Sequence, residues 1–323
     1  MNAKRWIALA VFFVLLFSMV TGTETVRSVL ETSNRWTVEI YEAGSGADIA
    51  LIDIRGPITY DSGEGSFFLE EGYSQNIFLE QIETAFVQDN IEAIILRVNS
   101  PGGAVTACDE VYQKIRSLKE ENEKPLVVYM ENIAASGGYL VSTTGDVIFA
   151  NRSALTGSIG VIMSSINVHR LADELGVEQK VIKSGPYKDI FNIFREVTKE
   201  ESEILQGIID ETYDFFIDSV LEGRDLERDD LLELADGRIY TATQAIENGL
   251  IDEIGFFQDV IEKTAELANT SDPNVIHFKR VPLKPFDYIF GQISRITLGP
   301  KSLEDYIETR KEEYPQLMYI WRP

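Results

Sequence analysis

Ser136 stands at the centre of the stretch ENIAASGGY, residues 131–139, whose residue types suit a serine nucleophile. An apolar run at 125–130 leads into it, and small residues follow. This order predicts that the serine passes from the end of a buried strand to the first turn of a helix. Backbone N–H groups at such a turn lack helical partners and favour developing negative charge. Taken alone, the stretch is also typical of a tight turn whose serine has no chemical role.

A serine nucleophile needs a base, and the two histidines of the chain are poor candidates. His169 begins a predicted helix, and His277 lies in a late polar stretch. The G-x-S-x-G signature of a hydrolase elbow is also absent, because Ala134 stands two residues before Ser136. The sequence therefore does not favour a Ser-His-Asp triad.

A lysine can serve instead if its amine is neutral at the working pH. The pKa of an ordinary lysine is ~10.4, and lowering it to ~7 costs about 4 kcal/mol, which desolvation in an apolar, enclosed setting can supply. Lys188 fits that need best, because a Gly-Pro turn precedes it and apolar residues flank it: Tyr187, Ile190, Phe191 and Phe194. The carboxylate of Asp189 would oppose the change unless it points away, as it would in an extended segment. The alternative is an ordinary solvated surface lysine.

Two glycine pairs offer backbone donors for an oxyanion. The sequence Pro101-Gly102-Gly103 closes a predicted strand and opens a helix, and Gly137 follows the candidate serine. The N–H groups of Gly103 and Gly137 could face each other across an oxyanion hole. A glycine pair in a turn is common, so this signal is weak by itself.

The elements that must position these residues alternate between strand and helix. This alternation predicts a single α/β domain with a largely parallel sheet. Strands are predicted at 48–55, 91–98, 125–130, 146–150 and 179–183, and helices at 77–88, 104–121, 169–175 and 199–221.

Composition narrows the classes of function. The formal net charge is −24, and an acidic surface repels nucleic acid. The one cysteine, Cys108, excludes an internal disulfide and is predicted to be buried on a helix face. One cysteine and two histidines give no zinc constellation, so neither a metal nor another cofactor is predicted.

The N-terminus predicts export. Lys4 and Arg5 precede an apolar run at 6–20, which favours an uncleaved single-span anchor with the body outside the cytoplasm; a cleaved signal peptide is the alternative. The predicted organisation is an anchor or signal at 1–23, a linker at 24–47, a catalytic domain at 48–270 and a C-terminal oligomerisation or tail segment at 271–323.

Five motifs, in this order, resemble the signal peptide peptidase A family, membrane-anchored Ser/Lys peptidases related in fold to Clp protease and the crotonases. The resemblance covers about residues 49–268. The motifs are NSPGG (99–103), ASGGY (135–139), TGSIGV (156–161), SGPYKD (184–189) and GRIYT with QA (237–245), which continues into GLID (249–252).

The resemblance implies that Ser136 is the nucleophile and Lys188 the general base, with Ser158 orienting the lysine amine. It implies an oxyanion hole from Gly103 and Gly137, no cofactor, and a fold of repeated β-β-α units. It also implies a bowl-shaped homo-octamer at the cell membrane that degrades leftover signal peptides and other unfolded apolar segments. Whether Lys188 acts within or between subunits stays open.

Two other classes of function remain as alternatives. One is a catalytically inactive, membrane-anchored scaffold that holds peptides, and the other is a crotonase-like hydratase. The hydratase would need a basic pocket for an acyl-thioester nucleotide, which the sequence does not show. The aromatic tail at 314–321 further suggests the hypothesis that the C-terminus occupies a neighbour's groove.

Overall fold

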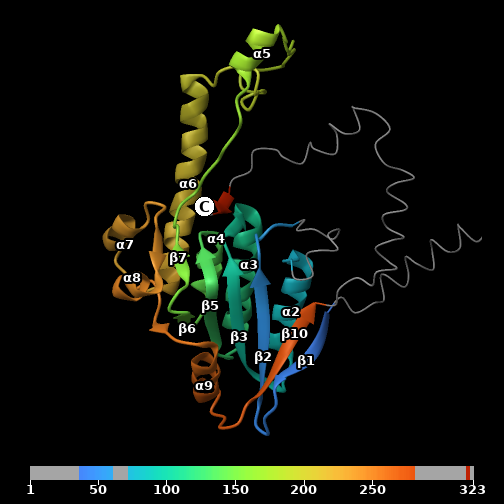
Figure 1. Cartoon of the computed structure of the whole chain (residues 1–323), viewed down its shortest axis with the longest axis vertical. Coiled ribbons are helices and arrows are strands. Elements are labelled where there is room, and N and C mark those ends of the chain that lie inside the picture. Colours follow the sequence, from blue (N-terminus) through green and yellow to red (C-terminus); the bar gives the residue numbers. More distant parts are fainter. Residues whose placement is uncertain (1–35, 61–71, 281–317, 321–323) are drawn as a thin grey trace, which may run out of the picture.

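The computed structural model describes residues 36–60, 72–280 and 318–320, which build a mixed α/β body around one large sheet (Figure 1). Within these residues the sheet has nine strands in the order β1-β10-β2-β3-β5-β6-β9, and β7 and β8 continue from β5. Neighbouring strands run parallel from β10 to β9, whereas β1 closes one edge antiparallel to β10. The strands are β1 (Trp36–Glu42), β2 (Asp48–Arg55), β3 (Ile91–Ser100), β5 (Leu126–Ala135), β6 (Val147–Ala150), β7 (Leu155–Gly157), β8 (Ile239–Thr241), β9 (Glu253–Ile254) and β10 (Asn274–Arg280).

The central strands are almost continuously apolar, as expected for parallel strands that are buried on both faces. Alternate side chains of β2 enter two different cores. Ile52 and Ile54 pack beneath α2 (Gln75–Val87) and α3 (Val105–Glu121), whereas Ile49 and Leu51 pack beneath α9 (Phe257–Leu267). Helices therefore cover both faces of the sheet (Figure 1).

Cys108 lies on the buried face of α3, as predicted. Burial raises the pKa of its thiol, so the group stays protonated and unreactive.

The remaining helices are α4 (Gly137–Ser142), α5 (His169–Leu175), α6 (Lys199–Gly223), α7 (Arg228–Leu234) and α8 (Ala242–Glu247).

A long arm projects from one end of the body. Figure 1 shows α6 rising beyond the sheet, with the chain between β7 and α6 running up to α5 at the far end. The C-terminal half of α6 is anchored in the core by Phe216, Ile217 and Val220. We call residues 163–198 the arm; several of its apolar side chains are exposed to solvent, among them Ile166, Leu171, Leu175, Val177 and Ile182.

The predicted helices at 77–88, 104–121, 169–175 and 199–221 are confirmed within two residues at each end. The predicted strand at 179–183 is wrong. These residues belong to the arm, form neither helix nor strand, and are exposed, with Ile182 at 92%. Apolar residues at 181 and 182 suggested a strand, but the fold places no sheet edge beside them to pair with.

The sheet extends past the predicted catalytic domain, 48–270, at both ends. Trp36–Glu42, from the predicted linker, pairs antiparallel with Asn274–Arg280, from the predicted tail. The Trp36 ring stacks on Phe278 with 4.8 Å between centroids.

The predicted anchor at 1–23 lies outside the described residues. Among the helices of the described ranges, none combines the length and the apolar character needed to cross a membrane.

Candidate active site

Ser136 occupies a strained turn between β5 and α4. Its backbone has φ 54° and ψ −119°, a region that residues other than glycine rarely adopt. Two hydrogen bonds hold the turn: the Ser136 N–H donates to the Gly157 carbonyl at 2.7 Å, and the Leu140 N–H donates to the Ser136 carbonyl at 2.9 Å. Ser136 is 1% exposed and is the N-cap residue of α4. The serine therefore sits where the sequence predicted it, at the junction of a buried strand and a helix.

Close packing beneath this turn explains why small residues follow the serine. A Cβ atom added to Gly138 would lie 2.6 Å from the Ser100 carbonyl oxygen at the end of β3. Gly138 thus lets α4 approach β3. The chain lacks the G-x-S-x-G signature, yet it forms a strained strand-to-helix turn with glycine at the second position after the serine.

Ser158 lies beside Ser136 because two parallel strands end in register. Ala135 of β5 pairs with Gly157 of β7, so that the two serines follow directly from paired residues. Neighbouring strands lie roughly 4.8 Å apart, which puts the two backbones within one strand spacing. Ser158 also has a positive φ, 51°, and its N–H donates to the Arg238 carbonyl at 2.7 Å. The fold brings these two predicted site residues together.

The oxyanion candidates Gly103 and Gly137 lie on two elements that contact each other, β4 (Gly102–Ala104) and α4. Ile58 brackets β4: its N–H donates to Gly102, and its carbonyl accepts from Ala104, both at 2.9 Å. A Cβ atom on Gly103 would lie only 1.9 Å from the Ile58 carbonyl oxygen, so this position requires glycine. Gly137 is the first residue of α4, where backbone N–H groups precede the helical hydrogen-bond pattern.

An extended piece of the chain's own C-terminus lies on β4. Strand β11 (Met318–Ile320) pairs antiparallel with it, with Tyr319 opposite Gly103. Met318 also exchanges two backbone hydrogen bonds with Ile162, at 3.1 and 3.2 Å. The edge of β4 at Gly103 is therefore able to take an extended segment by strand addition, as it does with β11.

A groove of about 350 Å³ opens beside Ser158 and receives Ile320 of β11. Its walls combine apolar and polar side chains, and the polar or charged ones include Gln206, Asp210 and Asp236. The groove-lining residues with apolar or aromatic side chains are Val161, Ile162, Ile209, Tyr213 and Ala235.

Lys188 is the one predicted site residue that the fold does not bring to Ser136 within one chain. It is exposed in the arm, near the N-terminal end of α6, whereas α4 contacts α6 near its other end, where Gly223 packs on Thr143. The groove beside Ser158 meets α6 at Gln206 and Ile209, whereas Lys188 lies in the arm before α6 begins. The expected apolar enclosure is also missing in the single chain, since Tyr187 is exposed.

Both histidines lie away from the serine. The ring of His277 contacts the Asp53 carboxylate at 3.1 Å on β10 and β2, three strand positions or roughly 14 Å from β5. His169 lies on α5 in the arm, 3.6 Å from Asp173. Burial disfavours the charged form of Asp53, but hydrogen bonds from His277 and Arg97 outweigh it and lower the pKa of this carboxyl. These residues form a structural ion cluster on the sheet.

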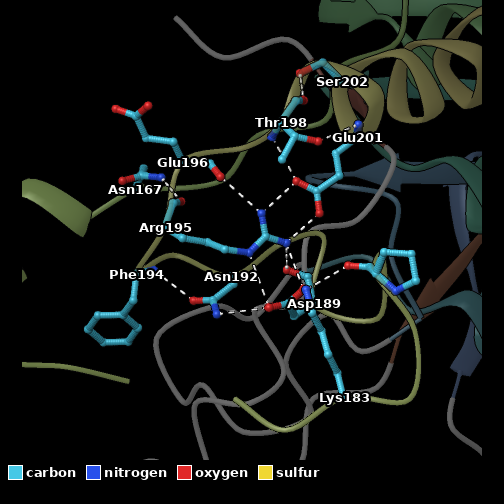
Figure 2. Close-up of polar contacts among 11 residues, drawn as sticks. Asn167, Lys183, Asp189, Asn192, Phe194, Arg195, Glu196, Thr198, Glu201 and Ser202 are labelled. Atoms are coloured by element: carbon cyan, nitrogen blue, oxygen red, sulfur yellow. Dashed lines mark hydrogen bonds and ion pairs between the residues drawn. The ribbon is translucent and has the colours of Figure 1, made fainter. Parts of the chain in front are cut away.

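Sequence reasoning missed a second ion cluster, which joins Asp189 and Arg195 of the arm to Glu201 of α6 (Figure 2). Only its helix end had a sequence signature: Thr198 and Glu201 match a capping box, and both of its hydrogen bonds are present. No group of three or more His, Cys, Asp or Glu side chains is arranged to hold a metal ion in the part of the chain that the structure describes.

Comparison with known proteins shows which family this chain resembles. A profile of peptidase family S49 matches residues 118–271, which include Ser136, Ser158 and Lys188. The chain is 34% identical over 295 residues to the putative signal peptide peptidase SppA of Enterococcus faecium, covering 86% of this chain and 85% of that protein. It is 35% identical over 276 residues to the putative protease MJ0651 of Methanocaldococcus jannaschii, covering 85% and 86%. It is also 30% identical over 240 residues to the chloroplastic serine protease SPPA of Arabidopsis thaliana, covering 73% and 34%.

Proposed function

The chain belongs to peptidase family S49 and is a serine-type peptidase, and from this premise we propose that Ser136 is its nucleophile and Lys188 its general base. The observation that carries the proposal is the strained, buried turn at Ser136, with Ser158 held beside it by the register of β5 and β7. Strained backbone of this kind is typical of a nucleophile presented at the end of a strand.

The proposed reaction is acyl transfer through a covalent intermediate. The neutral Lys188 amine takes the proton of Ser136 as the serine oxygen attacks the substrate carbonyl, and Ser158 orients the amine. The N–H groups of Gly103 and Gly137 stabilise the oxyanion. The lysine ammonium then protonates the leaving amine, and water hydrolyses the acyl-enzyme. No cofactor takes part in these steps.

We propose that Lys188 acts on Ser136 of a neighbouring subunit. Two features support this arrangement: the arm carries Lys188 away from its own serine, and the arm exposes apolar side chains that a second copy could cover. Contact between the arm of one subunit and the site of the next is head-to-tail, and such contacts generate closed rings. The proposed assembly is a bowl-shaped homo-octamer whose subunits have a Clp protease/crotonase-like fold.

The proposed substrates are leftover signal peptides and other unfolded apolar peptides outside the cytoplasm. The pairing of β11 with β4 supports an extended substrate, because a peptide bound in the same way would lay its backbone along Gly103. The apolar side chains that line part of the groove beside Ser158 support an apolar side chain at one substrate position. An N-terminal anchor at 1–23 would hold the peptidase at the cell membrane.

The proposal is tested with the full-length protein in detergent, from pH 6 to 10. The substrates are a fluorogenic apolar peptide and one protein in its folded and unfolded forms. We expect cleavage of the peptide and of the unfolded protein only. Turnover should rise with pH, since the base must be neutral, with a midpoint below the ~10.4 of ordinary lysine. Absence of cleavage by folded, assembled protein would leave the inactive scaffold as the better explanation, and hydration of an enoyl thioester would favour the hydratase.

Removal of the tail tests whether β11 competes with substrate. Deleting residues 312–323 is expected to raise kcat/KM for added peptide by about tenfold, because a tethered competitor has a high effective concentration. A chain that ends at Ile320, and so keeps β11, is the matched control. If the deletion changes neither turnover nor assembly, the tail has no role at the site.

A further inference from the structure

The loop that carries Lys188 lacks regular secondary structure of its own. Residues 183–194 form a series of turns, with the Lys188 N–H donating to Gly185 at 3.4 Å and the Asn192 N–H donating to Asp189 at 2.9 Å. Turn hydrogen bonds fix the local path of the chain but not its direction relative to the body. The direction of this loop must therefore be set by contacts with a rigid element.

Phe191 and Ile193 line a pocket together with Leu205 and Ile209 of α6, and Arg195 makes the polar contacts between the loop and this helix (Figure 2). Its guanidinium donates to both carboxylate oxygens of Asp189, at 2.8 and 3.3 Å, and to the Asp189 carbonyl at 2.8 Å. The same group donates to both carboxylate oxygens of Glu201, at 2.5 and 2.7 Å. Bidentate pairs of this kind fix orientation as well as distance. One planar group thus joins the residue after Lys188 to the first turn of α6.

Glu201 is the fixed end of this connection. Its side chain is 2% exposed, and its carboxylate also accepts the Thr198 N–H at 2.9 Å in the capping box. It belongs to α6, whose other end is packed in the core through Phe216 and Val220. The position of the lysine loop is therefore transmitted from the core along α6, through Glu201 and Arg195, to Asp189.

Asp189, the residue next to Lys188, is fully engaged by two cations. Besides Arg195, the Lys183 ammonium donates to its carboxylate at 2.5 Å and to the Pro186 carbonyl at 2.8 Å. The Asp189 side chain is only 14% exposed. A carboxylate that was free to turn toward a neighbouring amine would stabilise the ammonium form and oppose base catalysis. In the structure, Arg195 and Lys183 bind this carboxylate instead, which keeps it from turning toward the Lys188 amine.

We propose that Arg195 is a positioning residue for Lys188: together with Glu201 it aims the lysine loop and keeps the Asp189 carboxylate away from the lysine amine. The inference rests on the proposed role of Lys188 as the base. It adds a function for three charged residues, none of which needs to touch the substrate.

The cluster keeps its charges throughout the range of the assay. Hydrogen bonds from Arg195, and then from Lys183, lower the pKa of Asp189. Those from Arg195 and the Thr198 N–H lower the pKa of Glu201 to about 2, and Glu201 and Asp189 raise the pKa of Arg195. A lowered carboxyl pKa means that the paired state is lost only as the pH falls toward that value. Titration of Asp189, Glu201 or Arg195 is therefore not expected to produce a change between pH 6 and 10.

The test measures kcat and KM against pH for full-length Arg195→Met. We expect kcat to fall by about 100-fold at pH 7.5 with little change in KM, because the lysine is misplaced. We also expect the midpoint of the pH rise to move up by about one pH unit, because the Asp189 carboxylate loses the partner that fixes its direction and keeps only Lys183. Adding Asp189→Asn to this variant should return the midpoint to the wild-type value without restoring kcat. Arg195→Lys keeps the positive charge but loses the bidentate guanidinium. Its kcat and pH midpoint should lie between those of the wild type and Arg195→Met.

Arg228→Met is the matched control, because Arg228 also bridges two carboxylates, Asp214 and Asp218, but outside the arm. It should behave as wild type. Arg195→Met with wild-type kcat and pH midpoint would overturn the inference, as would a change confined to KM. If Arg195→Met does not assemble, the kcat and pH midpoint of Arg195→Lys test the inference in its place. Full turnover by Lys188→Ala would instead defeat the proposed function itself.

Discussion

Exchanging Ser136 for alanine is expected to lower kcat for peptide cleavage by about 10,000-fold or more, since the covalent route is lost. The fold should survive the change. The Ser136 side chain makes no cap hydrogen bond to α4, and alanine takes up the strained turn at a similar cost. The measurement is turnover of the apolar peptide, with circular dichroism and sedimentation to confirm folding and assembly.

Ser142→Ala is the matched control for this variant. Ser142 is a buried serine of the same helix, and its hydroxyl donates to the Gly138 carbonyl at 2.7 Å. Its loss should cost about 1 kcal/mol of stability and leave kcat nearly unchanged. Wild-type turnover by folded Ser136→Ala would assign the nucleophile to another residue.

Two inactive variants are expected to restore activity when they assemble together. Lys188→Ala alone should lower kcat by about 1,000-fold or more, because the base is lost. If each site takes Ser136 from one subunit and Lys188 from the next, co-expression of Ser136→Ala with Lys188→Ala rebuilds complete sites. With equal, random mixing around a ring, about one quarter of the sites contain both groups. The measurement is turnover of the purified mixed assembly per subunit.

The comparison is a mixture in which the double variant Ser136→Ala/Lys188→Ala replaces one partner. Neither arrangement of those subunits gives a complete site, so its turnover should stay at background. Mixed assemblies of the two single variants that also stay at background would show that Lys188 serves the serine of its own chain. In that case the arm would have to fold back toward the body, and the exposed apolar arm would need another explanation.

The central fold could be predicted because its signals are local. Continuous apolar runs identify the parallel strands, and helical spacing identifies α2, α3 and α6. The turn at Ser136 was predictable for the same reason, since small residues follow a buried strand. Strand β1 was missed because its burial comes from pairing with Asn274–Arg280, more than two hundred residues away in the chain.

The setting of Lys188 could not be predicted from its neighbours in sequence. Tyr187 and Phe191 suggested an apolar enclosure, but Tyr187 is exposed in the single chain, and the local order comes from charges instead. The link from Asp189 to Arg195 spans a turn with no standard spacing, so no periodicity reveals it. When another element or another subunit completes the environment of a side chain, the neighbouring residues in the sequence do not reveal that environment.

The left-handed backbone at Ser136 has a consequence for how this gene can change over time. Glycine would adopt φ 54° freely and relieve about 1 kcal/mol or more of strain, so the fold alone favours losing the hydroxyl. A lineage released from selection for catalysis would gain stability by drifting away from serine at this position. If Ser136 is the nucleophile, as proposed, serine persists there because its chemistry outweighs that gain, and its presence then reflects selection on the reaction and not on the scaffold.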